Sequence, residues 1–293
     1  MWLIFAAASA VCFGARGILY QWSSRMPVDR NLMLLGVFTC GTVLSLLINI
    51  PLGQVWSRGA LTGILMGAFS FLSNMSMYRG FAVGKASLVA VFTSLPASVV
   101  SIGAYILWGE TLNGWQFGAL CVILLGIVVI RYSNELTLSS LRGVQWAIVA
   151  MLGFACTDLF TKQSQLWQAE VLPTLTMMFA TGSLLFLLNW LQAVRSSRVQ
   201  AELKESAGNA ARWSGRRSFQ WGMLVGTTNI SGMLFIVPAF DLGPAGLVSA
   251  IAATGVLLIL LYTRFYQKER FTRPQLFGIS LTIVGILLLR LLG

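Results

Sequence analysis

Long, uninterrupted apolar runs constrain this chain more than any other feature. About ten of them can be marked, each of roughly the 20 residues that a helix needs to cross a bilayer. We place them at 2–21, 31–50, 59–82, 86–108, 115–131, 143–163, 172–194, 219–240, 244–265 and 274–292, joined by mostly short connections. Transmembrane β-strands alternate apolar and polar residues, and these runs do not. The pattern predicts an all-α integral membrane protein with ten transmembrane helices.

The composition also indicates that lipid is the main solvent. Only 10 % of the 293 residues are charged, whereas 57 % are hydrophobic. A soluble domain carries about 25 % charged residues, which cover its water-facing surface. Because the connections between the apolar runs are short, no soluble domain fits between them.

An internal repeat divides the chain into two halves. A shift of 159 positions needs no gap from Gly63 to Arg131 and superposes glycines and polar residues on residues of the same type. The matched pairs include Gly63 and Gly222, Gly67 and Gly226, Gly84 and Gly243, Glu110 and Glu269, Gln116 and Gln275, Gly126 and Gly285, and Arg131 and Arg290. The first helices match more weakly at a shift of 144, which pairs Trp2 with Trp146 and Cys12 with Cys156. We therefore predict two related five-helix repeats, at 1–135 and 140–293.

An odd number of helices in each half has a topological consequence. Two tandem copies of a five-helix unit cross the membrane in opposite senses, which makes an inverted-topology repeat. Many secondary transporters have this arrangement, with a substrate site near the bilayer midplane between the halves. A duplicated scaffold without a transport role is the alternative reading.

Glycine and proline positions predict where helices approach closely or break. Gly63 and Gly67, and their mates Gly222 and Gly226, form Gly-x-x-x-Gly motifs, which favour close helix packing in lipid and place the third and eighth runs inside the bundle. Pro96 lies mid-run in 86–108, where it removes a backbone hydrogen bond. Its mate under the 159 shift is Gly255. Hydroxyl residues flank both positions, namely Thr93, Ser94 and Thr254, so the pattern is typical either of cavity-lining kinks or of ordinary packing.

Ionisable residues inside the apolar runs are the candidates for function, because each costs roughly 2.5–3.5 kcal/mol on insertion scales. Arg16 lies inside the first run, and Asp158 inside the sixth with Lys162 four residues later, a spacing at which the two can pair. Arg79 lies near the end of the third run. Arg79 and Lys162 also have the simpler explanation that they snorkel to the interface. The predicted substrate-binding residues are Arg16, Asn74, Tyr78, Arg79, Thr93, Ser94, Asp158, Lys162, Asn229 and Thr254.

Helix direction sorts these charges between the two membrane faces. The first and third runs point the same way, which brings Arg16 and Arg79 toward one face, whereas Asp158, Lys162 and Asp241 fall toward the other. We therefore expect one vestibule rich in arginine and a second of mixed charge.

Loop charges predict the orientation, because Lys and Arg gather in cytoplasmic loops. The odd-numbered loops carry nearly all of them, and the even-numbered loops have little beyond Arg58. The basic residues of the odd loops are Arg25, Arg30, Arg142, Arg195, Arg198, Lys204, Arg212, Arg216, Arg217, Lys268, Arg270 and Arg273. Both termini are then expected outside, and the net charge of +11 requires no nucleic-acid partner.

The sequence gives little support for a bound cofactor or for an enzymatic activity. The chain has no histidine, and its four cysteines lie inside apolar runs without a Cys-x-x-Cys pair. A structural zinc site needs Cys and His ligands in close groups, so we predict no metal and no cofactor. A membrane-embedded enzyme would need a nucleophile–base pair or a metal cluster, and neither pattern appears.

The motifs resemble one known family. The run Gly84-Lys-Ala-Ser-Leu-Val-Ala is followed by Pro96, Gly109-Glu110, Gln116 and Gly126, and the second half repeats it with Gly243-Pro-Ala-Gly-Leu-Val-Ser, Glu269, Gln275 and Gly285. This pattern is similar to the EamA-like ten-helix family of the drug/metabolite transporter superfamily. The resemblance implies a secondary carrier with a cavity lined by the first, third, fourth, sixth, eighth and ninth helices. It also implies that Pro96, Gly255, Glu110 and Glu269 are structural, and that both termini are cytoplasmic, against the charge bias.

The expected function is transport of small polar or amphipathic metabolites by alternating access, as an exporter in the cell (plasma or inner) membrane. A lipid flippase or scramblase on the same fold is the alternative. Arg16 and Arg79 favour an anionic or zwitterionic substrate, and Asp158 suits a cationic group or a coupling proton. Proton or ion coupling and a homodimer are left open, with membrane lipid as the surrounding partner.

Overall fold

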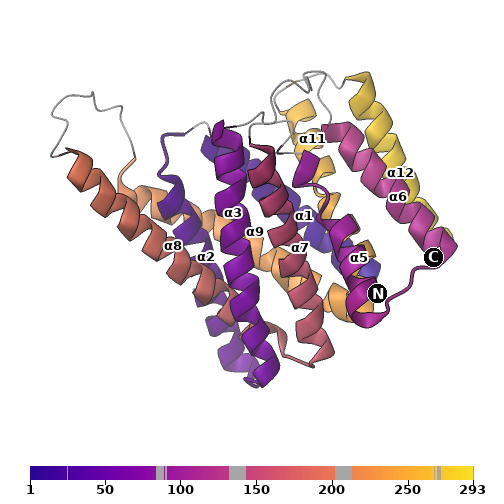
Figure 1. Cartoon of the computed structure of the whole chain (residues 1–293), viewed down its shortest axis with the longest axis horizontal. Coiled ribbons are helices and arrows are strands. Elements are labelled where there is room, and N and C mark those ends of the chain that lie inside the picture. Colours follow the sequence, from indigo (N-terminus) through magenta and orange to yellow (C-terminus); the bar gives the residue numbers. More distant parts are fainter. Residues whose placement is uncertain are drawn as a thin grey trace.

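The computed structural model describes residues 1–24, 26–83, 89, 91–131, 143–201, 213–266, 268 and 272–292. Nearly all of these residues are helical (Figure 1). The helices of the first half are α1 (Trp2–Ser24), α2 (Arg30–Leu52), the short 3-10 helix η1 (Arg58–Leu61), α3 (Thr62–Val83), α5 (Pro96–Trp108) and α6 (Gly114–Arg131). Those of the second half are α7 (Val144–Leu166), α8 (Val171–Ala201), α9 (Gly215–Leu242), α10 (Ala245–Ala253), α11 (Val256–Phe265) and α12 (Arg273–Leu292).

These helices correspond to the apolar runs, and the predicted fold class is confirmed. Among the described residues, eight helical stretches are long and apolar enough to cross a membrane, and two shorter apolar helices, Pro96–Trp108 and Gly114–Ile130, fall in the fourth and fifth runs. The ninth run is divided between α10 and α11, which the turn at Thr254 and Gly255 joins. The chain is an integral membrane protein of the ten-helix type.

Successive spans run in opposite directions, so the bundle has two ends. The terminal end holds the start of α1, the end of α12 and the turns at 53–57, 109–113, 167–170 and 243–244. Figure 1 shows both chain termini on the same side of the molecule. The odd-loop end holds the turn at 26–29 and the residues that precede α9 and α12.

The helix pairings follow the inverted repeat. Helix α3 of the first half packs on α7 and α8 of the second, and its repeat mate α9 of the second half packs on α1 and α2 of the first. The pair α6 and α12 are repeat mates that pack on each other, at one edge of the bundle (Figure 1). The symmetry that the sequence repeat predicts is therefore visible in which helices touch.

Glycines allow the closest of these approaches. A Cβ on Gly222 of α9 would collide with the main chain of Met33 in α2, and one on Gly63 of α3 with the main chain of Thr174 in α8. These two contacts are related by the repeat, since Gly63 and Gly222 are mates. The Gly-x-x-x-Gly motifs thus hold α3 and α9 inside the bundle, as close packing in lipid requires.

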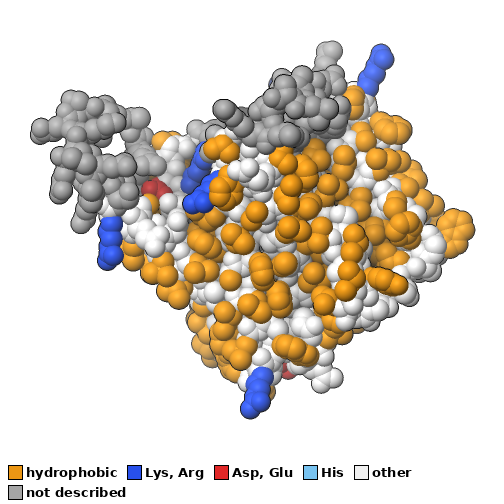
Figure 2. All heavy atoms as spheres, in the orientation of Figure 1, with side chains coloured by type: hydrophobic (Ala, Val, Ile, Leu, Met, Phe, Trp, Pro, Cys, Tyr) orange, Lys and Arg blue, Asp and Glu red, His pale blue; other side chains and the backbone are white. Residues whose placement is uncertain are grey.

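The outer surface is apolar around the flanks. Side chains such as Ile50, Ile106 and Leu291 are 77 %, 72 % and 76 % exposed, which only lipid tolerates over so wide a belt. Figure 2 shows hydrophobic side chains covering most of the visible flank, with Lys and Arg toward its margins. This distribution is that of a bilayer-spanning bundle.

Candidate functional site

A cavity of about 790 Å³ lies in the middle of the bundle, between the two halves. Helices α1, α2 and α3, residue Thr93, and helices α5, α7, α9, α10 and α11 contribute to its wall. Arg30, at the start of α2, lines it and is solvent-exposed, so the cavity reaches the surface at the odd-loop end. A cavity of this size accommodates a metabolite-sized ligand.

Arg16 of α1 is the most constrained charge in this cavity. Its Nη1 donates a hydrogen bond to Oδ1 of Asn229 in α9, which joins the two halves. Its guanidinium carbon lies 4.6 Å from the ring centroid of Phe13 and 5.9 Å from that of Tyr20. Cation–π contacts of this kind add attraction that grows when water is excluded. The guanidinium is therefore fixed on three sides.

Asp158 of α7 is the carboxylate of the cavity wall, and we call Arg16 and Asp158 the two poles of the cavity. Its Oδ2 accepts a 2.6 Å hydrogen bond from the hydroxyl of Ser249 in α10, and both residues line the cavity wall. The expected Asp158–Lys162 pair does not form, because Lys162 turns toward other partners. Arg16 and Asp158 line one cavity, which corrects the expectation of two vestibules that separate them. The two halves bring these residues together because α1 and α7 both face the central space.

The wall contributed by α3 follows helical periodicity. Asn74, Met77 and Tyr78 line the cavity, at positions i, i+3 and i+4, which share one helix face. Tyr78 is also close to Arg30, whose guanidinium carbon lies 5.6 Å from the ring centroid. Sequence reasoning missed Arg30, Tyr20 and Ser249. Arg30 falls in a predicted loop, and a neutral hydroxyl inside an apolar run costs too little free energy to mark it as functional.

Five predicted residues lie outside the cavity wall. Arg79 is exposed, with its guanidinium carbon 5.0 Å from the ring centroid of Trp146. One residue beyond Tyr78, it is turned about 100° around α3 and away from the cavity. Ser94 and Thr254 are buried and donate their hydroxyls to the carbonyls of Val91 and Ile251. Asn229 and Lys162, the other two, are described below.

Thr93 and the two helix breaks do border the cavity. Thr93, Pro96 and Gly255 all line it. The chain turns at residues 93–95 before α5 begins at Pro96, and it turns again at 254–255 between α10 and α11. These breaks are repeat mates at one depth, and irregular backbone at membrane depth is tolerated where it lines a cavity. Asn229 is not part of the wall but reaches it through Arg16.

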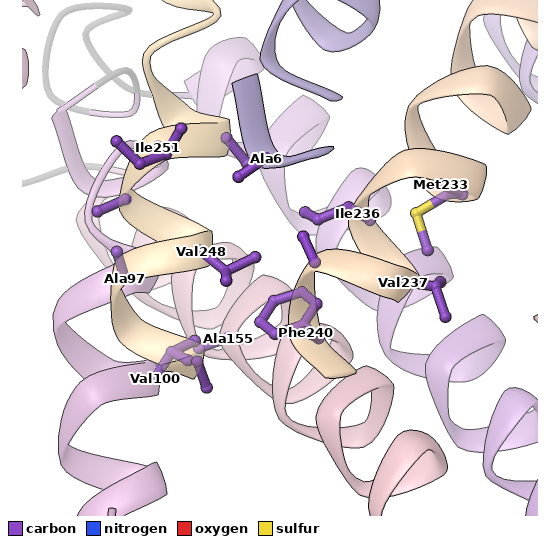
Figure 3. Packing of buried hydrophobic residues seen from close by; sticks show 14 of the residues in the cluster. Ala6, Ala97, Val100, Ala155, Met233, Ile236, Val237, Phe240, Val248 and Ile251 are labelled. Atoms are coloured by element: carbon purple, nitrogen blue, oxygen red, sulfur yellow. The ribbon is translucent and has the colours of Figure 1, made fainter. Parts of the chain in front are cut away.

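Below the cavity, toward the terminal end, apolar side chains close the space. Val100 of α5, Phe240 of α9 and Val248 of α10 are each 0 % exposed, and we call these three residues the apolar seal. Figure 3 shows Phe240 and Val248 near one another, with Val100 and Ala155 beside them. Because the three come from both halves, the seal holds the halves together at this end.

A polar cluster lies beyond the apolar seal, and we call it the terminal lock. Lys162 of α7 donates to the carbonyls of Phe240 and Gly243 at 2.7 and 3.0 Å, and its Nζ is 4.0 Å from Oε2 of Glu110. Glu110 in turn accepts a 2.6 Å hydrogen bond from the backbone N–H of Ala245, the first residue of α10, where a carboxylate also favours the helix dipole. Its repeat mate Glu269 is outside the described residues.

Comparison with known proteins fits this architecture. The model of the EamA-like transporter family matches residues 1–132 and 141–291. The chain belongs to the EamA-like transporter family. The family's members are membrane transporters, which is consistent with a central cavity between inverted halves. Among curated proteins, none matches this EamA-like sequence.

A solved crystal structure shares the fold of this EamA-like chain. It superposes with a TM-score of 0.72 at 12 % sequence identity, and the match covers 99 % of this chain and 98 % of the other. At this identity the likeness shows the fold alone. No described side chain of α6 or α12 lines the cavity, as the family resemblance implied, whereas α2 does contribute through Arg30 and Met33.

Proposed function

We propose that this EamA-like protein is a secondary carrier that moves small polar or amphipathic metabolites across the cell membrane by alternating access. The observation that supports it most is the contrast along the central axis. The cavity reaches the surface at the odd-loop end, past the exposed Arg30, while the apolar seal and the terminal lock close the other end. A carrier needs this one-sided geometry, and a channel does not.

The chemistry of the closed end suits a reversible closure. The terminal lock consists of hydrogen bonds and one ion pair, which exchange readily with water when the helices separate. Because the two halves are related as an inverted repeat, exchanging their conformations gives a second state, which is open at the terminal end and closed at the odd-loop end. Rocking of one half against the other then moves the opening from one membrane face to the other.

Cysteine accessibility tests the alternation directly. The four native cysteines are replaced by alanine, and Val248→Cys places one thiol in the apolar seal. We expect a membrane-impermeant maleimide to label this thiol slowly from the terminal end, because the seal opens there part of the time. Val37→Cys, equally buried in the α2–α9 contact, is the matched control and should stay unlabelled. Labelling of neither thiol from the terminal end contradicts alternating access.

Substitutions in the cavity test whether the same site binds the cargo. Arg16→Ala and Asp158→Asn proteins that still reach the membrane should lose transport in proteoliposomes, measured with and without a pH gradient. Each removes one pole of the cavity and leaves the apolar seal and the terminal lock in place. Normal transport by both variants would remove these residues from the site.

A further inference from the structure

Arg16 lacks a charge partner in the part of the chain that the structure describes. The ion pair found there joins Lys162 to Glu110, and no carboxylate lies within 4.0 Å of the Arg16 guanidinium. Asp158, the acidic residue of the cavity wall, is instead hydrogen-bonded to Ser249. Charges within a membrane normally pair with one another. We therefore expect the anionic partner of Arg16 to come from outside the chain, as a group of a bound ligand.

The guanidinium is also preorganised for such a partner. Asn229 accepts from one of its N–H groups and Phe13 stacks on it, which fixes the direction of the side chain. A guanidinium has five N–H donors in a rigid fork, and the bond to Asn229 uses one. The remaining donors suit the two oxygens of a carboxylate or a similar oxyanion, which arginine binds in bidentate fashion.

The rest of the wall defines what the remainder of the ligand must look like. Arg30 adds a second positive charge at the opening, so the wall carries two guanidinium groups and one carboxylate. Most of the remaining wall is apolar, with Phe13, Phe154, Ile236, Val256 and Ile259. The Asp158–Ser249 pair can accept a hydrogen bond from a donor at the far end of the ligand.

We infer that the cavity binds an organic acid whose acid group meets Arg16, whose apolar body packs on the aromatic and aliphatic wall, and whose other end presents a hydrogen-bond donor to Asp158. Asn229 is the positioning residue for Arg16. This inference rests on the proposed function, because it names the class of cargo for that carrier. Acid recognition and alternation are nevertheless separable, since the first depends on Arg16 and the second on the closed end.

A matched set of four ligands tests the inference on purified full-length protein. 4-(Aminomethyl)benzoate has both poles, 4-methylbenzoate has the acid alone, 4-methylbenzylamine has the amine alone, and 4-(aminomethyl)benzamide has a neutral group in place of the acid. Thermal stabilisation against ligand concentration gives the apparent Kd. We expect the two-pole acid to bind most tightly, at least tenfold more tightly than its amide, and the acid alone to bind better than the amine alone.

Three variants assign the effect to the residues. Arg16→Gln should reduce the preference for acid over amide at least tenfold. Asn229→Asp supplies an internal anion, so it should keep or raise thermal stability while acid binding falls, a result that a purely structural role for Asn229 does not produce. Arg79→Gln, which changes an exposed arginine outside the cavity, is the control and should bind as the unmodified protein does.

The outcomes separate the inference from the function. Equal binding of acid and amide, no binding of either acid, or an acid preference undiminished in Arg16→Gln overturns the inference. If Val248→Cys is labelled from the terminal end in any of those cases, alternating access stands and the cargo belongs to another class. If acids bind but that thiol is never labelled, the site is correct and the carrier mechanism is wrong.

Discussion

The two ends of the central space are built from equivalent helices and yet have opposite character. At the odd-loop end the cavity holds Arg16, Arg30 and Tyr78 around open volume. At the terminal end the apolar seal and the terminal lock place buried side chains on the axis. The inverted repeat makes each end the counterpart of the other, so the difference reflects the conformation together with divergence of a few side chains.

The repeat mates of the cavity residues make the contrast concrete. The mate of Arg16 under the 144 shift is Phe160, which stacks on Phe69 with ring centroids 5.7 Å apart and planes at 14°. The mate of Asp158 is Gly14, where a Cβ would collide with Gly255 and Leu258. These two charged groups of the cavity therefore have an apolar and a space-saving counterpart. A duplicated scaffold has kept its packing while its recognition groups became asymmetric, as an asymmetric ligand requires.

The compartment that each end faces gives the largest predicted effect, because the readout is all or none. The basic odd loops predict that the odd-loop end is cytoplasmic, so an alkaline phosphatase fused after Gly293 should be active and a fluorescent protein fused there dark. Family resemblance implies the reverse. A fluorescent C-terminal fusion would defeat the charge argument and turn the open end toward the outside.

Removing the cation of the terminal lock should have the largest effect on stability. Lys162→Ala leaves Glu110 and the carbonyls of Phe240 and Gly243 without it, in a site where the lysine side chain is only 11 % exposed. Loss of one partner from a buried pair costs about 3–5 kcal/mol, measurable as a lower thermal midpoint in detergent. Because the proposed open state lacks these contacts, labelling of Val248→Cys from the terminal end should rise.

Two controls show whether that effect belongs to the terminal lock. Arg79→Ala removes an exposed cation that only stacks on Trp146, so it should cost less than about 1 kcal/mol. The double variant Lys162→Met with Glu110→Gln should recover part of the loss, since neither charge is then left unpaired. If the double variant loses as much stability as Lys162→Met and Glu110→Gln lose when added together, the two residues act independently.

A pair of single hydrogen-bond deletions gives the smallest effects and the sharpest comparison. Trp108→Phe removes the 3.0 Å bond from the indole to Gln163 near the terminal end, and Trp221→Phe removes the 2.7 Å bond to Ser23 at the odd-loop end. Each should cost about 1 kcal/mol. Only Trp108→Phe should raise labelling of Val248→Cys from the terminal end. Equal labelling by both would mean that the ends are not independently held.

Much of this architecture could be predicted from sequence because bilayer crossing imposes length and apolarity on every span. The internal repeat identified Pro96 and Gly255 as matched helix breaks. The free-energy cost of a charge inside the membrane identified Arg16 and Asp158 as candidate functional residues. The facing of side chains near helix ends was harder, since Arg79 and Tyr78 differ by one residue and point in different directions. The terminal lock joins residues far apart in the chain, Glu110 with Lys162 and Ala245, and local pattern gives no signal for such contacts.

The two helix breaks have a consequence for the electric field at the centre of the membrane. Helix α5 begins at Pro96 and α11 follows Gly255, both of which line the cavity. The N-terminal ends of α5 and α11 are thus directed at the same space, but so is the C-terminal end of α10, since Ala252 and Ala253 also line the cavity. Each helix end carries a partial charge of about half an elementary unit, positive at an N-terminus and negative at a C-terminus. At the Gly255 break the two signs oppose one another, so the backbone adds little net attraction for an anion, and Arg16→Gln should lose most of the preference for acids.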